Sequence, residues 1–290
     1  METTPPRRSH FFRPSDGKVY VKYLLSSTTL TIPTGWTSNQ PAPYFGHFDI
    51  DTTPTTNQQQ TDIALYDPDT ATFQLLLSTG NWTGSGIVTR NLCAGLPTPC
   101  KFLPQGSGTS AQRGGAVPVF GLRRYVVHSQ INRTRPLGAL GLWDPSDGSW
   151  NVLWDPTSSS TLSTHYWGDL GDLLVGDGVG IARIDALSQS GKRSDVVIYR
   201  SESNIGPGYF WRCPFTSGGL YCDSSTEQSI AVTGGSKSTA AFSLSDLGGD
   251  GKPELCTLSS NNATVTCFTS DSGYTTSVSV SFSQLGGTLL

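Results

Sequence analysis

The chain alternates apolar and aromatic residues with polar ones in short runs separated by tight polar turns, and this unit recurs. Its copies are FFRPSDGKVYVKYLL from Phe11, DIALYDPDTATFQLLL from Asp62, ALGLWDPSDGSWNVLW from Ala139, DVVIYRSESNIGPGYFWRC from Asp195 and ELCTLSSNNATVTCF from Glu254. Alternation with a period of two predicts β-strands. Central turns rich in Pro, Asp and Gly (RPSDGK, DPDTAT, DPSDGS) predict that each copy is a β-hairpin.

The five copies share an aromatic or apolar anchor position. The anchors are Phe12, Tyr66, Trp143, Tyr199 and Leu258, separated by 54, 77, 56 and 59 residues. A strand and an acidic loop are expected before three of the hairpins, at 46–62, 182–195 and 243–254, and a fourth strand after each hairpin. Four strands per repeat of this length predict an all-β fold, a β-propeller of five four-stranded blades.

The two ends of the chain predict a closed ring. Residues 1–9 read as a polar tail, and the first copy begins at its second strand. The C-terminal segment VSVSFSQLGGTLL is similar to AFSLSDLGG of the fifth copy. A strand within 277–290 would therefore complete the first blade and hide the sheet edges, giving one propeller domain over 10–290. An arc of a larger propeller, or an irregular blade within the 77-residue interval, remains the alternative.

Composition and charge narrow the classes of protein. Charged residues are 14% of the chain and only four are glutamates, which disfavours helices. A net charge of −3 carries no signal for nucleic acid. No apolar run reaches the roughly 18–20 residues of a membrane span, and METTPPRRSHFF contains no signal-peptide core.

The six cysteines fall into three local pairs, separated by 7, 9 and 11 residues: Cys93 with Cys100, Cys213 with Cys222, and Cys256 with Cys267. These separations suit bridges in or beside hairpins, whereas a thiolate metal site would need C-x2-C spacing or nearby histidines. Three disulfides indicate an oxidising compartment and a secreted protein. Glycosylation sequons at Asn81, Asn132 and Asn262 agree with this prediction.

The acidic loops carry a resemblance to a known family. Gly46-His47-Phe48-Asp49-Ile50-Asp51 followed by Thr61-Asp62-Ile63-Ala64-Leu65-Tyr66-Asp67-Pro68 resembles the FG-GAP/VCBS repeat, which builds the propeller of integrin alpha subunits. The loop and apolar strand at 246–258 resemble the same motif. The resemblance implies a loop between the first and second strands of a blade that binds Ca²⁺ and stiffens the blade.

The residues of the 246–254 loop suit calcium chemically. Ca²⁺ takes six to eight hard oxygen ligands, and we expect Asp246, Asp250, Glu254 and the Lys252 carbonyl to supply them. Gly248 stands where the family usually has Asn or Asp, so one ligand would be water. A plain acidic turn is the alternative.

The other loops predict weaker metal sites or none. Asp49, Asp51 and Asp62 form a candidate site with a polar insertion, and Asp185 and Asp195 form a poorer one. The third repeat has no acids, and its stretch 121–139 carries Arg123, Arg124, Arg133, Arg135 and His128 instead. Guanidinium groups there would replace the cation by pairing with neighbouring acids, bind an anionic ligand such as a uronate or sulfate, or form a solvated basic loop.

Catalytic signals are weak. His165 and Tyr166, in a segment shared with Trp167, Asp169, Asp172 and Asp177, are candidates for the base of a lyase, although a connection between blades is the simpler interpretation. Trp36, Trp82 and Trp167 lie near loops where exposed indoles could stack on sugars.

The sequence therefore predicts a secreted, calcium-stabilised propeller that binds a glycan or an extracellular protein, and it favours a binding module over an enzyme without deciding between them. The alternatives are a polysaccharide-active enzyme, either a lyase or a glycoside hydrolase, and a structural surface-assembly protein.

Overall fold

A computed structural model describes residues 8–13, 15–23, 29–33, 43–49, 61–67, 72–82, 86–92, 117–119, 122–128, 133–144, 147–159, 161–168, 172–175, 195–201, 208–213, 215–216, 219–220, 228–232, 238–244, 254–259 and 264–281. Strands form most of the regular structure of these residues, with 3-10 turns at η1 (Ser78–Gly80) and at Gly86. The predicted all-β class is confirmed.

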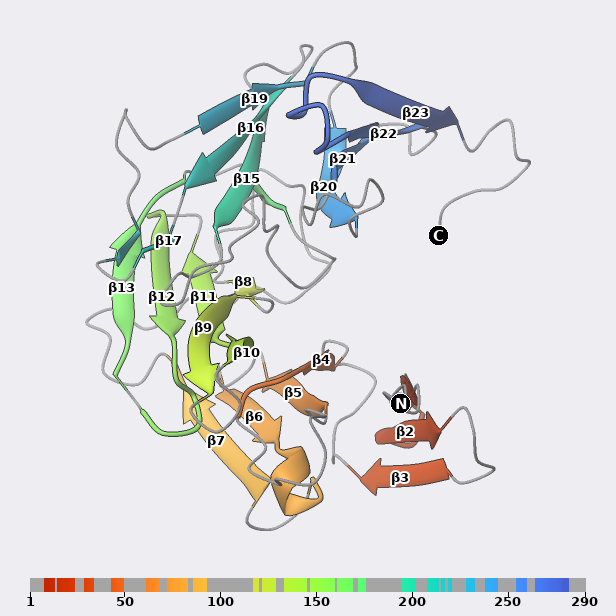
Figure 1. Cartoon of the computed structure of the whole chain (residues 1–290), viewed down its shortest axis with the longest axis vertical. Helices are drawn as coiled ribbons and strands as arrows, with labels where there is room; N and C mark the ends of the chain where they lie inside the picture. The colour runs from red at the N-terminus through yellow and green to blue at the C-terminus, as the bar shows by residue number, and fades with distance from the viewer. Residues whose placement is uncertain are drawn as a thin grey trace. The chain divides into compact units, whose positions relative to one another are not determined.

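Antiparallel sheets follow the five predicted repeats in chain order (Figure 1). The first sheet contains β1 (Arg8–Arg13), β2 (Lys18–Tyr23) and β3 (Thr29–Pro33). The second contains β4 (Tyr44–Gly46), β5 (Asp62–Asp67), β6 (Thr72–Leu76) and β7 (Ile87–Asn91). The third contains β8 (Val117–Val119), β11 (Leu140–Asp144), β12 (Ser149–Leu153) and β13 (Ser163–Tyr166).

The remaining strands form two more such sheets and two small hairpins. The fourth sheet contains β14 (Leu173–Leu174), β15 (Val196–Ser201), β16 (Gly208–Cys213) and β19 (Gln228–Ala231). The fifth contains β20 (Ser238–Leu244), β21 (Glu254–Ser259), β22 (Thr264–Phe268) and β23 (Ser277–Ser281). One hairpin pairs β9 (Arg123–His128) with β10 (Arg133–Gly138), and the other pairs β17 (Phe215–Thr216) with β18 (Gly219–Leu220).

The anchor positions are equivalent in the structure. Each anchor lies directly opposite a residue of the next strand: Phe12 with Val19, Tyr66 with Phe73, Trp143 with Trp150, Tyr199 with Phe210, and Leu258 with Val265. Three of these pairs are aromatic, with ring centroids 4.7, 5.6 and 5.4 Å apart. Cross-strand aromatic pairs stabilise a sheet beyond their buried area, so the repeat is defined by a recurring contact.

Two of the hairpins have their turns at the positions that the sequence predicts. Arg13 pairs with Lys18 and Asp144 with Ser149, which leaves four-residue loops. Gly17 and Gly148 adopt φ of 60° and 70° at the last loop position, a left-handed conformation that favours glycine.

The long interval between the second and third anchors contains an inserted hairpin. β9 and β10 lie between β8 and β11 in the chain, yet β8 pairs with β11 and β9 pairs with β10. The basic stretch at 121–139 is therefore largely a regular ladder of six residue pairs, and the loop interpretation is wrong for these strands. An irregular blade in this interval was the alternative to five regular blades.

Two expected strands lie elsewhere. The first strand of the fourth repeat was expected within 182–195, but the strand that pairs with β15 on that side is β14, Leu173–Leu174. Residues 182–194 lie outside the described residues. Residues 277–281 pair with β22 as the fourth strand of the fifth sheet and do not complete the first blade. Because the connection from β22 is short, pairing with β22 loses less chain entropy than pairing with the N-terminal sheet would. Residues 282–290 lie outside the described residues.

The chain divides into two compact units. One contains Met1–Phe102 with Asp155–Ser160, and the other contains Leu103–Trp154 with Thr161–Leu290. In the first unit, Val19 packs with Ile63 and Leu65, so the first and second sheets share a core. In the second, the third and fourth sheets share a core, as do the fourth and fifth.

Strand β15 explains why the sheets stack. Val196 and Ile198 lie in the core shared with the third sheet, and Val197 and Tyr199 lie in the core shared with the fifth. A strand that is buried on both faces has a continuous apolar run instead of alternation, as VVIY does.

Candidate functional site

A buried acid recurs at one position of the repeat, four residues before the anchor. Asp62, Asp195 and Glu254 are 0%, 2% and 3% exposed. Ala139 occupies this position in the third repeat and Arg8 in the first. Burial of a carboxylate requires hydrogen bonds or a counter-charge, and each acid meets the requirement differently.

Asp62 accepts two backbone hydrogen bonds. Its Oδ2 accepts the Phe48 N–H at 2.7 Å and its Oδ1 accepts the Ser78 N–H at 2.8 Å. Burial, together with the nearby Asp49 charge, outweighs these bonds and raises the pKa of Asp62 to about 7. Asp49 Oδ2 itself accepts the Thr79 hydroxyl at 2.7 Å. Two neighbouring carboxylates with hard oxygens fit a divalent cation.

Asp195 is neutralised by an arginine. Arg212 Nε and Nη2 lie 2.9 and 2.8 Å from its Oδ2. The guanidinium supplies the positive charge that a metal would supply, and calcium at Asp195 stays a prediction. Asp185 lies outside the described residues.

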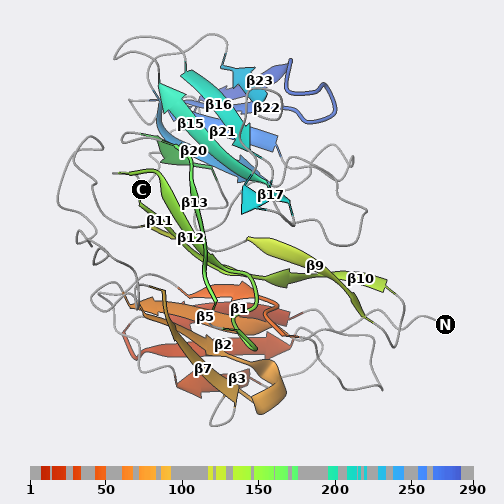
Figure 2. The ribbon, with the colours of Figure 1, turned by 90° about the vertical axis from the view of Figure 1, so that its left-hand side faces the viewer.

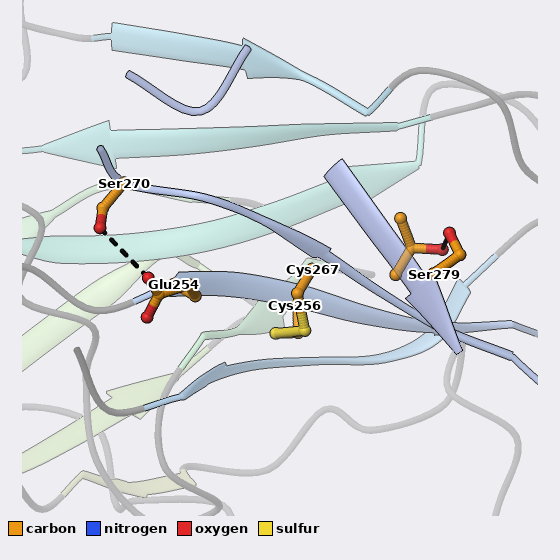
Figure 3. Close-up of a disulfide and its surroundings, with 6 residues drawn as sticks. Glu254, Cys256, Cys267, Ser270 and Ser279 are labelled. Atoms are coloured by element: carbon orange, nitrogen blue, oxygen red, sulfur yellow. Dashed lines mark hydrogen bonds between the residues drawn. A yellow bond between two sulfur atoms is a disulfide. The ribbon is translucent and has the colours of Figure 1, made fainter. Parts of the chain in front are cut away.

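Glu254 accepts a hydrogen bond from a serine hydroxyl. Ser270 Oγ lies 3.3 Å from Glu254 Oε1, as the dashed line in Figure 3 marks. Ser270 follows the end of β22 by two residues, just as Ser78 follows the end of β6. The serine is thus part of the repeat.

The same turn carries a buried aromatic in a left-handed conformation. Trp82 and Tyr274 adopt φ of 58° and 65°, and each donates its N–H to the carbonyl five residues earlier at 2.9 Å. The Trp82 indole N–H also donates to the Thr61 carbonyl at 3.1 Å. Sequence reasoning missed this turn, although STGNW and SDSGY after equivalent strands are a signal that could have revealed it.

The predicted calcium ligands are therefore only partly placed. Within the described ranges, no three His, Cys, Asp or Glu side chains come together as a metal site. Asp51, Asp246, Asp250 and Lys252 lie outside those ranges. The Asp49–Asp62 pair is the described fragment that fits a cation.

The cysteine predictions are confirmed in one case. Cys256 and Cys267 are opposite one another in β21 and β22 and form a disulfide, with Cα atoms 4.0 Å apart (Figure 3). Cys213 is also disulfide-bonded. Its expected partner Cys222, together with Cys93 and Cys100, lies outside the described residues.

Two of the three candidate ligand-binding tryptophans lie among the described residues. Trp82 is 5% exposed and packs in the core of the first unit. Trp167 packs against the core of the third and fourth sheets. The expectation of an exposed indole is wrong for Trp82, because a neighbouring sheet covers its position, which local composition does not reveal. Trp167 is partly buried. Trp36 lies outside the described residues.

The catalytic candidates do not converge. His165 and Tyr166 are successive residues of β13, so they lie on opposite faces of the strand. Tyr166 is 72% exposed. Asp172 is buried and holds Arg200 through two contacts of 2.8 Å, which makes it a structural ion pair. Asp169 and Asp177 lie outside the described residues.

The predicted basic ligand site lies on the β9–β10 hairpin. Arg123 and Arg124 are at the start of β9, and Arg133 and Arg135 are in β10. Arg133 lies opposite His128.

Comparisons with known proteins add no family. No protein-family model matches the chain, and no curated protein matches it either. The FG-GAP/VCBS resemblance therefore rests on the quoted motifs. No helix within the described parts of the chain is long and apolar enough to cross a membrane.

Proposed function

We propose that this chain is a secreted binding module that recognises carbohydrate or an extracellular protein, built as a calcium-stabilised five-bladed β-propeller. One observation carries the proposal. A framework of one three-stranded and four four-stranded sheets holds inserted hairpins, β9–β10 in the third repeat and β17–β18 in the fourth. A repeated frame with variable insertions is typical of proteins that display recognition elements on a rigid scaffold.

The blade arrangement is supported by the order and stacking of the sheets. In four of the sheets, four antiparallel strands lie side by side in the order in which they occur in the chain. Within the larger unit, successive sheets share hydrophobic cores. In a propeller each blade packs on the next in this manner.

Calcium would stiffen the loops between first and second strands. Asp49 and Asp62, with Asp51, would hold it in the second repeat. Asp246, Asp250, Glu254 and the Lys252 carbonyl would hold it in the fifth. The ion would offset the burial and the nearby Asp49 charge, which together raise the pKa of Asp62. Its role would be structural.

The secreted location is supported by the disulfide chemistry. The Cys256–Cys267 bridge and the bonded Cys213 suit an oxidising compartment. Asn81, in an exposed turn, begins a glycosylation sequon.

A glycan array combined with an activity screen on anionic polysaccharides tests the function. We expect saturable binding of a defined glycan or, in a pull-down from secreted proteins, of a defined partner, without product release. Formation of unsaturated oligosaccharides would instead identify a lyase and overturn the binding-module proposal. Absence of any binding would also overturn it.

A further inference from the structure

The last strand of the fifth sheet forms an accessible edge. β23 pairs with β22, and no strand of the described residues lies on its other side (Figure 2 shows β22 and β23 side by side). Its first four residues are all exposed, and Val278 and Val280 are 60% and 47% exposed. Within the described residues, these are two of the four exposed large hydrophobic side chains. The strand is therefore accessible from both faces.

The backbone groups of Ser277 and Ser279 point away from β22. Successive residues of an antiparallel strand direct their N–H and C=O alternately to the two neighbouring sides. The Thr269 N–H donates to the Thr276 carbonyl at 3.0 Å, so the Thr276 carbonyl points to the β22 side. By alternation the peptide groups of Val278 point there too, whereas Ser277 and Ser279 direct theirs outward.

The Cys256–Cys267 pair gives the same alternation independently. The two Cα atoms are 4.0 Å apart, closer to the roughly 4.5 Å of a pair that exchanges no hydrogen bonds than to the roughly 5.5 Å of a hydrogen-bonded pair (Figure 3). The backbone of Cys267 is therefore turned away from Cys256 and toward Val278, its partner in β23. The outer edge of β23 offers the peptide donors and acceptors of Ser277 and Ser279.

The sequence of β23, SVSVS, reads the same in both directions about Ser279. An antiparallel second copy centred on Ser279 puts Val278 opposite Val280 of that copy, and Ser279 opposite its own equivalent. The paired side of β23 uses the same alternation: Val280 lies opposite Val265, and the Ser279 and Thr266 hydroxyl oxygens are 2.8 Å apart. Pairs of β-branched residues and pairs of hydroxyls both stabilise antiparallel strands. The edge is therefore complementary to itself.

Charge does not oppose this pairing. Sheet edges are commonly protected from association by charged residues or proline. β3 ends in Pro33 and β7 contains Arg90. β23 contains neither kind of residue, and the sequence from residue 272 to residue 290 has no charged side chain. Two copies of this edge therefore meet without repulsion between like charges.

We propose that two copies of this chain associate through β23, paired antiparallel about Ser279, so that their fifth sheets form one sheet with four strands from each copy. The contact is closed, because each copy covers the edge of the other, and the product is a two-fold dimer and not a filament. The association does not depend on the ligand proposed above. A dimer would carry two copies of that binding surface.

The size of the edge determines how tight the dimer can be. Five residues from each copy are far fewer than the roughly 20–30 residues a side of a standard interface. We therefore expect a reversible dimer, whose fraction rises with protein concentration.

Sedimentation equilibrium of the full chain over about a hundredfold range of concentration tests the proposal. Val278→Lys places a charge on the edge, and Ile87→Lys places the same charge at an exposed aliphatic side chain of β7 as the matched control. We expect a monomer–dimer equilibrium that Val278→Lys weakens at least about tenfold and Ile87→Lys leaves unchanged. Circular dichroism and the Tm establish that each variant is folded.

Cross-linking of introduced cysteines tests the register. Ser279→Cys brings the two new thiols opposite one another, with Cα atoms about 5.5 Å apart, a separation that a disulfide spans. Ser277→Cys lies on the same face, but its two thiols are four residue positions apart, about 13 Å. Mild oxidation should give a covalent dimer on a non-reducing gel with Ser279→Cys and little with Ser277→Cys.

Three results would overturn the proposal. A monomer at every concentration would mean that another segment of the chain or a different protein covers β23. A dimer that Val278→Lys weakens no more than Ile87→Lys would use another surface, and equal cross-linking of the two cysteine variants would exclude the register. The binding function is tested separately: a monomer that binds its glycan or protein removes only the dimer, and a dimer that binds neither removes only the binding function.

Discussion

Asp62 shows how much one residue position contributes to this repeat. Its carboxylate is fully buried, accepts two backbone N–H groups and lies near Asp49. The folded protein therefore binds a proton at Asp62 more tightly than the unfolded chain, in which the pKa is close to 3.8. That difference links stability to pH.

Without calcium, the free energy of unfolding should fall as the pH rises from about 4 to about 7. The protonated form is favoured in the folded state, so the stabilisation is complete below about pH 4 and is lost as Asp62 ionises near pH 7. Urea unfolding in chelator at several pH values measures this, and Asp62→Asn should flatten the profile. A wild-type profile parallel to that of Asp62→Asn would contradict the assignment.

Asp195 should be the most sensitive residue of the fourth sheet to loss of its partner. Arg212→Met leaves a carboxylate that is 2% exposed without its guanidinium, which typically costs about 3–5 kcal/mol. Arg13→Met removes an exposed pair with Asp16 and should cost at most about 1 kcal/mol. Guanidinium unfolding compares them, and equal losses would refute the structural role of Arg212.

At the level of elements, the turn glycines should differ in their tolerance of a side chain. A Cβ at Gly148 would collide with the Gly168 carbonyl oxygen, whereas a Cβ at Gly273 would meet nothing within 4 Å. Both have positive φ. Gly273→Ala should cost about 1 kcal/mol of backbone strain, and Gly148→Ala clearly more, because the β13 end must move. Thermal unfolding of the two variants measures the difference.

The hairpin arrangement also predicts the remaining disulfides. Non-reducing peptide mapping should return Cys93 with Cys100 and Cys213 with Cys222, beside the Cys256–Cys267 bridge. These pairings close short loops within or next to a single repeat. A bridge between different repeats would break the hairpin interpretation of the cysteines.

Elements with strong local signals were predicted well. The hairpins at 8–23, 62–76, 140–153, 196–213 and 254–268 combine period-two alternation with defined turns. β9, β10 and β14 were missed. RRYVVH and RTRPLG contain too many charges to suggest paired strands, and the Leu173–Leu174 strand is too short to show a period.

At the level of the whole molecule, calcium removal is the decisive experiment for the architecture. EDTA should lower the Tm by about 5 °C or more if an ion holds the loops between strands, since a ligand that binds only the folded state stabilises it. The double variant Asp246→Asn/Asp250→Asn should have a lower Tm than the wild type, and EDTA should change its Tm less than it changes that of the wild type. An unchanged wild-type Tm in EDTA would remove calcium from the proposal.

The sequence by itself determined the all-β class, the five repeats, the anchor positions and the recurring acids, because alternation and turn residues act over a few neighbours. Only the tertiary structure decided what each acid contacts, why Trp82 is buried, and that the basic stretch at 121–139 contains a paired hairpin. These outcomes depend on which strands pair and which sheets stack. Such contacts join residues far apart in the chain, and their energy leaves no local pattern.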